Sequence, residues 1–260
     1  MRLRVKTSIV LAILIIPAVL FGGWAFNVLI GAIAFIGAIE LLDMAKLDTK
    51  SFPAIVTYLG TLSIVYFQHF AGFVPDQLSE GIMPILAVLL LLVSTVIIKE
   101  YNFTKAAISA LTMFYVGVGA QAAVVIREAD LAIFVFILLV IISTDIGAYF
   151  IGSKIGKRKL APLLSPNKSV EGSLGGIVMA LLVASIYLNF ISLPYSYIMM
   201  LFIAVILSIT GQFGDLLESA LKRHFQVKDS GTILPGHGGI LDRFDSILFT
   251  LSMALILGVF

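Results

Sequence analysis

The sequence has no cysteine and very little charge. Without cysteine there is no disulfide framework and no thiol chemistry, so the compartment has to be inferred from charge. Charged residues make up only 12% of the 260 residues, whereas hydrophobic residues make up 60% and the mean hydropathy is +1.11. These values lie well outside the globular range. Almost no polar sequence remains for a soluble domain of ordinary size, so the function is expected at a membrane.

Apolar runs long enough to cross a bilayer recur along the whole chain. They predict an all-α, polytopic integral membrane helical bundle of about nine transmembrane helices, forming one membrane-embedded domain over 1–260. The expected spans are 8–21, 24–39, 54–73, 82–98, 106–126, 131–150, 173–191, 196–214 and 247–260. A single helix over 8–39 is the alternative at the start, but it would extend about 48 Å against a hydrocarbon core of about 30 Å. Two helices therefore fit better.

Basic residues are distributed asymmetrically over the predicted loops. With the N-terminus in the cytoplasm, sixteen of the seventeen Lys and Arg residues fall in inner loops, and only Arg127 falls outside. The outer loops carry Asp76, Glu80, Glu128 and Asp130 instead. By the positive-inside rule this predicts a multi-pass protein of the plasma or inner membrane with a cytoplasmic N-terminus. A cleaved signal peptide is the alternative for the first apolar run, although no small-x-small cleavage site stands out.

Charge is concentrated in residues 214–246, on the predicted cytoplasmic side. This segment holds five of the fifteen acids, four of the seventeen bases and two of the three histidines. If the eighth span continues as a helix past Gly214, one face carries Asp215, Glu218 or Ser219, and Lys222. The sequence therefore predicts a stripe of charged side chains where this helix leaves the membrane.

Asp242 and Asp245 are three residues apart, just before the ninth span. Two helix ends can thus each bring a carboxylate to one cytoplasmic-side site, and such carboxylates suit Mg²⁺, which completes its shell with water and phosphate oxygens. The segment also contains a glycine-rich turn over 236–239 and four bases, Lys222, Arg223, Lys228 and Arg243. Acids for a metal, bases for phosphate and a turn that lets N–H groups approach an anion together indicate a phosphoryl-group site.

A second active-site segment is expected over 145–172. Asp145 lies inside the sixth predicted span, where an ionisable group is costly unless it is paired, hydrated or liganded. Lys168, in the following loop, is a further candidate to bind phosphate. Small residues at 148, 152 and 156 would allow close helix packing around the site, although ordinary packing without catalytic meaning explains them equally well.

Residues 219–245 closely resemble the signature of the phosphatidate cytidylyltransferases, also called CDP-diacylglycerol synthases. The matching positions are Ser219, Leu221, Lys222, Arg223, Lys228, Asp229, Gly231, Ile233 or Leu234, Pro235, His237, Gly238, Gly239, Ile240, Asp242, Arg243, Phe244 and Asp245. The resemblance extends upstream to Asp145, Ala148, Tyr149, Gly152, Gly156, Ser165, Pro166, Lys168 and Ser169. Family members more often have Thr at the last of these positions. The first hundred residues match only in general character.

The resemblance implies a multi-pass enzyme that converts CTP and phosphatidic acid to CDP-diacylglycerol and pyrophosphate with Mg²⁺ and a second cation such as K⁺. The expected partners are CTP, phosphatidic acid and the lipid bilayer, without nucleic acid; a homodimer stays open. Expected metal ligands are Asp215 and Asp242, with Asp145 and Asp245 as further carboxylates. Expected catalytic or phosphate-binding cations are Lys222, Arg223, Lys168, Lys228 and Arg243. Ser165, Ser169, His237, Gly238 and Gly239 are the remaining expected substrate-binding residues.

Two other classes of function remain open at this stage. A CTP-dependent polyprenol or lipid kinase would use similar cations and metals but would transfer the γ-phosphoryl group and leave CDP. A secondary transporter would explain an acid inside a span, yet transporters hold ions near the midplane in a repeat, and no internal repeat is visible. The bases could also serve topology alone, with the acids merely pairing them.

Overall fold

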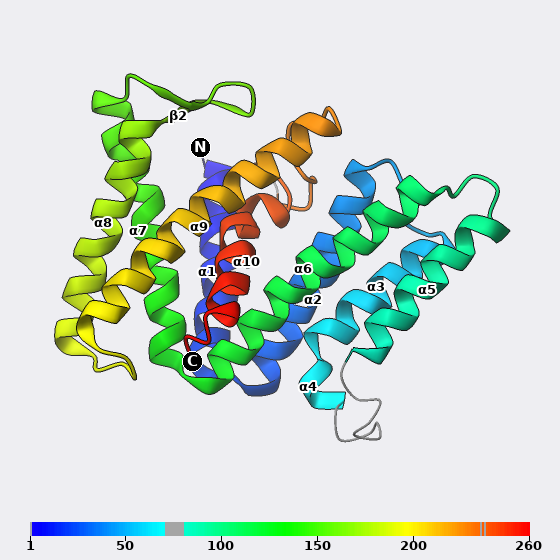
Figure 1. The fold of residues 1–260 in the computed structure, drawn as a ribbon, viewed down its shortest axis with the longest axis horizontal. Helices are drawn as coiled ribbons and strands as arrows, with labels where there is room; N and C mark the ends of the chain where they lie inside the picture. The colour runs from blue at the N-terminus through cyan, green and yellow to red at the C-terminus, as the bar shows by residue number, and fades with distance from the viewer. Residues whose placement is uncertain (1, 71–80, 235, 237) are drawn as a thin grey trace. The chain divides into compact units, whose positions relative to one another are not determined.

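A computed structural model describes residues 2–70, 81–234, 236 and 238–260 (Figure 1). The chain forms two compact units. Unit 1 comprises residues 1–124 and 227–243, and unit 2 comprises residues 125–226 and 244–260. The expectation of a single domain over 1–260 stays a prediction.

The prediction of an all-helical, polytopic membrane protein is confirmed. Among the described residues, five helices are long and apolar enough to cross a membrane: α2 (Gly23–Met44), α6 (Phe103–Ala129), α7 (Leu131–Ile155), α8 (Val170–Phe190) and α9 (Tyr197–His224). The other helices of the described part are shorter or only partly apolar: α1 (Arg2–Phe21), α3 (Phe52–Val65), α4 (Phe67–Phe70), α5 (Ile82–Ile97) and α10 (Leu241–Ile256). Apart from the single turn α4, each corresponds to one predicted span.

The first two spans are separate helices, as predicted. α1 ends at Phe21 and α2 begins at Gly23, and between them Gly22 has φ 66° and Gly23 has φ 61°. This left-handed backbone is strained for residues with a Cβ, so a glycine pair suits the break. The third span is shorter than expected, because α3 ends at Val65. The end of the predicted span, from residue 71, lies outside the described residues.

A small hairpin adds β structure that the all-α prediction did not include. Strand β1 (Lys159–Ala161) pairs antiparallel with β2 (Ser165–Ser169), with Lys159 opposite Ser169. The hairpin joins α7 to α8, and the Glu171 carboxylate accepts a hydrogen bond from the Lys157 backbone N–H at 2.9 Å. The segment that carries Lys168 is therefore a strand rather than an open loop.

In unit 1, α3 packs against both α2 and α5 (Figure 1). Its core contains Val56, Leu91 and Met113, which come from three different helices. Gly60 allows α3 to approach α6 closely, since a Cβ at this position would collide with the Met113 sulfur. This packing supports α2, whose last turns carry a buried acid described below.

In unit 2, α7 and α8 lie side by side along much of their length, and α9 contacts both (Figure 1). Their backbones nearly touch, because a Cβ at Gly147 would lie 2.8 Å from the Gly175 carbonyl oxygen and 3.1 Å from the Gly176 Cα. At the hairpin end, Gly152 and Gly172 approach each other in the same way. Gly152, one of the small residues predicted to allow close packing, does so here, whereas Gly147, Gly175 and Gly176 were not predicted.

Candidate active site

Helix α9 brings the predicted charge stripe onto one continuous helix. It runs without a break past Gly214 to His224, as the sequence suggested. Gly214 also lets α9 approach α10 within unit 2, since a Cβ there would lie 2.9 Å from the Phe249 Cβ and 3.0 Å from the Asp245 carbonyl oxygen. Asp215 comes one residue after this close contact at Gly214, and Lys222 comes eight residues after it.

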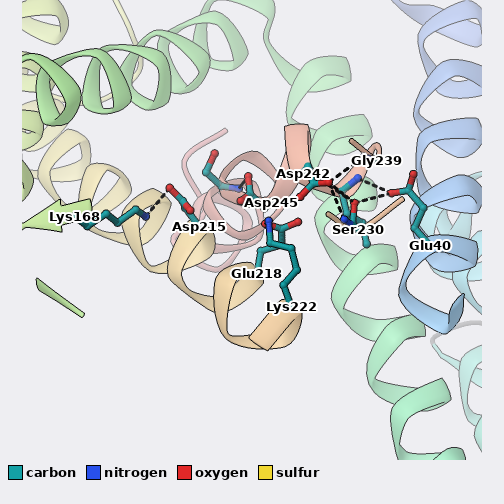
Figure 2. Close-up of polar contacts among 11 residues, drawn as sticks. Glu40, Lys168, Asp215, Glu218, Lys222, Ser230, Gly239, Asp242 and Asp245 are labelled. Atoms are coloured by element: carbon teal, nitrogen blue, oxygen red, sulfur yellow. Dashed lines mark hydrogen bonds and ion pairs between the residues drawn. The ribbon is translucent and has the colours of Figure 1, made fainter. Parts of the chain in front are cut away.

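Asp215 is paired with Lys168. The Lys168 Nζ lies 2.5 Å from the Asp215 Oδ2, and both side chains are only partly exposed, at 27% and 39%. Figure 2 shows the two side chains pointing toward each other, one from β2 and the other from α9. Two segments that sequence analysis proposed separately, 145–172 and 214–246, therefore meet at this ion pair.

A second ion pair lies one helical turn further along α9. The Lys222 Nζ contacts the Glu218 Oε2 at 2.5 Å, and Glu218 is almost fully buried (Figure 2). Burying a carboxylate is costly without compensation, and a paired ammonium group supplies it. The sequence left open whether Glu218 or Ser219 belongs to the charged face. The structure shows that Glu218 contacts Lys222.

Two further carboxylates of unit 2 lie near Asp215. Asp145, on α7, interacts electrostatically with Asp215 and Lys168. Asp245, on α10, is 8% exposed and accepts a hydrogen bond from the Ser246 N–H at 2.7 Å. Burial, followed by the negative charge of Asp215, raises the pKa of Asp245 above its ordinary value, and Lys222 opposes this effect.

The chemistry of these donors fits a hard divalent cation. Among the described residues, no group of three or more His, Asp or Glu side chains is arranged closely enough to hold a metal ion. Mg²⁺ does not need such a cage, because it commonly takes one or two carboxylates together with water and substrate phosphates. Asp145, Asp215 and Asp245 supply carboxylate oxygens within electrostatic range of one another. They could therefore share a metal that arrives with a nucleotide.

In unit 1, Asp242 is held by its own loop. Its Oδ2 accepts hydrogen bonds from the Ser230 N–H at 2.8 Å, from the Ser230 hydroxyl at 3.0 Å and from the Gly239 N–H at 2.9 Å (Figure 2). One backbone N–H of the glycine-rich turn, that of Gly239, thus does contact an anion. In this structure that anion is a carboxylate of the protein, so phosphate binding by Gly239 stays a prediction.

Sequence analysis missed Glu40, which lies near the end of α2. This side chain is 3% exposed and accepts hydrogen bonds from Ser230, Ile240 and Leu241. The signal was present, because an acid at the end of an apolar span is costly for the same reason as Asp145. Glu40 was passed over because the predicted span ended at residue 39 and left it in a loop. Ser230, inside the signature segment, was missed as well.

The remaining predicted site residues take varied positions. Ser169 is buried and caps α8, accepting a hydrogen bond from the Gly172 N–H at 3.1 Å. Ser165 begins β2, and Gly238 has φ 84°. Three cations are exposed at the surface of their units: Arg223, Lys228 and Arg243. His237 lies outside the described residues.

A cavity of about 440 Å³ adjoins the Lys168 side chain in unit 2. Its walls come from α7, α8, the hairpin and α9, and they include Tyr149, Gly152, Leu160 and Gln212. The cavity combines a cationic side chain with largely apolar walls. That combination suits a ligand with an anionic group and hydrocarbon.

The whole length of the chain matches one family of known proteins. A sequence model described as "Cytidylyltransferase family" matches residues 2–260. The chain belongs to this family. It is 44% identical to the phosphatidate cytidylyltransferase of Bacillus subtilis (strain 168), with 96% of this chain and 95% of that protein covered.

Other relatives of the family agree over the full length. The phosphatidate cytidylyltransferase of Staphylococcus saprophyticus is 41% identical, covering 99% of this chain and 98% of that protein. The protein of the same name from Staphylococcus aureus (strain COL) is 38% identical with the same coverage. The chain is therefore a nucleotidyltransferase, and the resemblance inferred from residues 219–245 is confirmed.

Proposed function

We propose that this chain transfers the cytidylyl group of CTP to phosphatidate at the cytoplasmic face of the membrane, giving CDP-diacylglycerol for phospholipid synthesis. The observation that carries the proposal is full-length identity of about 40% to proteins named phosphatidate cytidylyltransferase. The membrane helices support it, because the lipid substrate keeps its acyl chains in the bilayer.

The reaction requires no general base. The phosphomonoester of phosphatidate has a second pKa near 6, so it is largely a dianion at neutral pH. One of its oxygens attacks the α-phosphorus of CTP, a new P–O bond forms, and the bond to the α,β-bridging oxygen breaks. Pyrophosphate leaves with the electron pair. The protein then has to hold two polyanions in line and stabilise the charge that develops on the leaving group.

The carboxylates and lysines of unit 2 suit this task. Asp215 is proposed as a metal ligand, with Asp145 and Asp245 as further carboxylates that hold Mg²⁺ directly or through water. Mg²⁺ would neutralise charge on the phosphates of CTP when it is bound. Lys168 already pairs with Asp215, so a phosphate group can replace that carboxylate as its partner once the metal takes Asp215. A second cation such as K⁺ remains part of the proposal.

Asp242 is proposed as the other metal ligand. Its carboxylate is held in a fixed orientation by Ser230 and Gly239, and such preorganisation favours binding without further ordering cost. Four nearby cations in the sequence are proposed to bind phosphate: Lys222, Arg223, Lys228 and Arg243. The remaining residues proposed to contact the substrates are Ser165, Ser169, His237, Gly238 and Gly239.

The test is the product pair. Purified protein in lipid micelles with phosphatidate and α-³²P-labelled CTP is expected to form labelled CDP-lipid and unlabelled pyrophosphate. Labelled CDP together with a phosphorylated lipid would instead identify a kinase. Absence of both products with an active control enzyme in the same micelles would contradict the proposal.

A further inference from the structure

Glu40 is a buried carboxylate that connects α2 to the start of α10 within unit 1. The Ile240 N–H donates to its Oε1 at 2.8 Å, and the Leu241 N–H donates to its Oε2 at 2.9 Å. The Ser230 hydroxyl lies 3.1 Å from Oε2. These donors compensate burial of the negative charge, and the N-terminus of α10 favours an anion at this position. Glu40 therefore caps the start of a helix that lies 200 residues further along the sequence.

The same contacts extend to Asp242 through Ser230. The Ser230 hydroxyl lies within hydrogen-bond distance of both Glu40 and the Asp242 Oδ2, and it accepts a hydrogen bond from the Asp242 N–H at 3.2 Å. A hydroxyl group has one hydrogen, so it can donate to only one of these carboxylates at a time. Figure 2 shows Ser230 between the two acids. The orientation of Asp242 thus depends on a side chain that Glu40 also holds.

Two glycines, Gly231 and Gly239, lie so close to the Glu40 carboxylate that they leave no room for a Cβ. A Cβ added at Gly231 would lie 2.6 Å from the Glu40 Oε1, and one added at Gly239 would collide with the Glu40 Oε2 and with the Ser230 Oγ. A larger residue at either position would require the loop or the Glu40 carboxylate to move. Gly239, which belongs to the turn expected to approach phosphate, and Gly231 therefore both make room for a protein carboxylate.

We propose that Glu40 is a positioning residue for cytidylyl transfer, which holds the Ser230 hydroxyl and the backbone of Ile240 and Leu241 so that Asp242 is fixed in its working orientation. Glu40 does not touch the reacting atoms in this scheme, since its carboxylate is buried and engaged by three protein donors. The inference rests on the proposed function, in which Asp242 serves the reaction. A misplacement of about 1 Å at a reacting group can cost about 100-fold in rate, so such support is expected to matter.

The test compares Glu40→Gln with Asp43→Asn. Asp43 lies three residues further along α2 and is exposed, so its variant controls for loss of one negative charge on the same helix. Glutamine keeps the shape of Glu40 but offers only one acceptor oxygen, leaving one of the donors opposed by an NH₂ group. Hydrogen exchange of peptides over 230–242 is measured in metal-free protein, together with the thermal midpoint. Steady-state constants for CTP and phosphatidate are measured in parallel.

Glu40→Gln is expected to raise exchange in 230–242 while leaving α7 and α8 unchanged, and to lower kcat at least ~10-fold with both KM values within about threefold. Asp43→Asn is expected to match the wild type in every measurement. Glu40→Asp keeps the charge and should recover part of the lost rate. Wild-type exchange in 230–242, or raised exchange with wild-type kinetics, would overturn the proposal. So would increased exchange throughout unit 1, because that outcome indicates a general structural role.

Ser230→Ala provides a second variant in case Glu40→Gln does not fold. It removes the hydroxyl between the two acids and leaves Glu40 with its backbone donors. We expect raised exchange in 230–242 and a smaller loss of kcat than in Glu40→Gln, and wild-type exchange and kcat in Ser230→Ala would contradict the proposal. Where Glu40→Gln does fold, the Glu40→Gln/Ser230→Ala double variant is expected to lose less kcat than the product of the single losses. Multiplicative losses would contradict coupling through Ser230. If Asp242→Asn retained normal turnover, the proposed role of Asp242 would fail separately, whatever the exchange data showed for Glu40.

Discussion

Asp215 and Asp242 are both proposed as metal ligands, but their surroundings differ. Asp215 is partly exposed and has a lysine as its partner, whereas the Asp242 Oδ2 accepts hydrogen bonds from a loop that is itself tied to a buried acid. The first carboxylate can exchange its partner when a substrate arrives. The second is fixed before any substrate is bound.

Replacement of either acid by asparagine is expected to lower turnover at least ~100-fold at saturating substrates, since one strong electrostatic group is lost. Exposed ion pairs contribute only about 0–1 kcal/mol, so simple charge pairing predicts activity within roughly fivefold of the wild type. Turnover of purified Asp215→Asn and Asp242→Asn is measured over a range of Mg²⁺ concentrations, with Asp43→Asn as the control. Near-normal turnover with normal Mg²⁺ dependence would show that the replaced acid is not a ligand.

The ion pair of Lys168 with Asp215 leads to a related prediction, in which the loss of Lys168 affects substrate binding more than it affects the stability of the fold. A pair this exposed stabilises the fold by about 0–1 kcal/mol, so Lys168→Ala is expected to shift the thermal midpoint by only a few degrees. Its kcat/KM for phosphatidate or CTP is nevertheless expected to fall at least ~10-fold, since charge-assisted contacts to phosphate are strong. Wild-type kinetic constants for both substrates in Lys168→Ala would contradict a role in substrate binding and would leave only the ion pair with Asp215.

At the scale of elements, the close contact of α7 and α8 sets the position of the hairpin that carries Lys168. The contact depends on residues without side chains at 147, 175 and 176. Gly147→Val would force the two backbones apart, and overpacking of this kind costs about 1–3 kcal/mol.

The measurement for Gly147→Val is the thermal midpoint of the purified protein, which we expect to fall by about 2–10 °C. Leu182→Val is the matched control, because Leu182 is on α8 but 55% exposed. A midpoint equal to that of the wild type in Gly147→Val would show that α7 and α8 can separate freely. Activity is expected to fall together with stability if the helices place the hairpin.

Sequence predicted the helices well because hydropathy is a local property. Each of the nine predicted runs corresponds to one helix of the described residues, with only the single turn α4 in addition, and the break at residues 22 and 23 followed from length. The hairpin over 159–169 was missed, since its strands are only three and five residues long and contain a proline. No periodic pattern can develop in so few residues.

The site was predictable where neighbours in space are neighbours in sequence. The pairing of Glu218 with Lys222 follows from helical spacing, whereas the pairing of Lys168 with Asp215 depends on how α7, α8 and α9 pack. Glu40 and Ser230 are 190 residues apart, so no spacing rule connects them. Burial of Glu40 was inferable in principle from its place at the end of an apolar helix, but its partners were not.

For the whole molecule, the distribution of bases predicts the orientation in the membrane. Reporters fused after Lys50, Lys105, Lys159 and Lys228 are expected to be cytoplasmic, whereas reporters near Glu80 and Asp130 are expected to be external. The check is enzymatic activity of paired reporters that work on opposite sides of the membrane. An external Lys228 would place the signature segment out of reach of cytoplasmic CTP and would contradict the proposed function.

Because α9 is one unbroken helix of 28 residues, the positions of its residues along the helix axis are fixed relative to one another. At 1.5 Å per residue it is about 42 Å long, roughly 12 Å more than the hydrocarbon core. Measured from Tyr197, Asp215 falls at about 27 Å and Lys222 at about 37 Å along the axis. With its first residue at the outer edge of the core, an upright helix would hold the aspartate about 3 Å short of the inner edge of the core, next to the head groups, and the lysine about 7 Å beyond that edge. These depths follow from helix length alone, so a lipid whose phosphate binds beside Asp215, through Lys168 or the proposed metal, could keep its tails among those of its neighbours throughout the reaction.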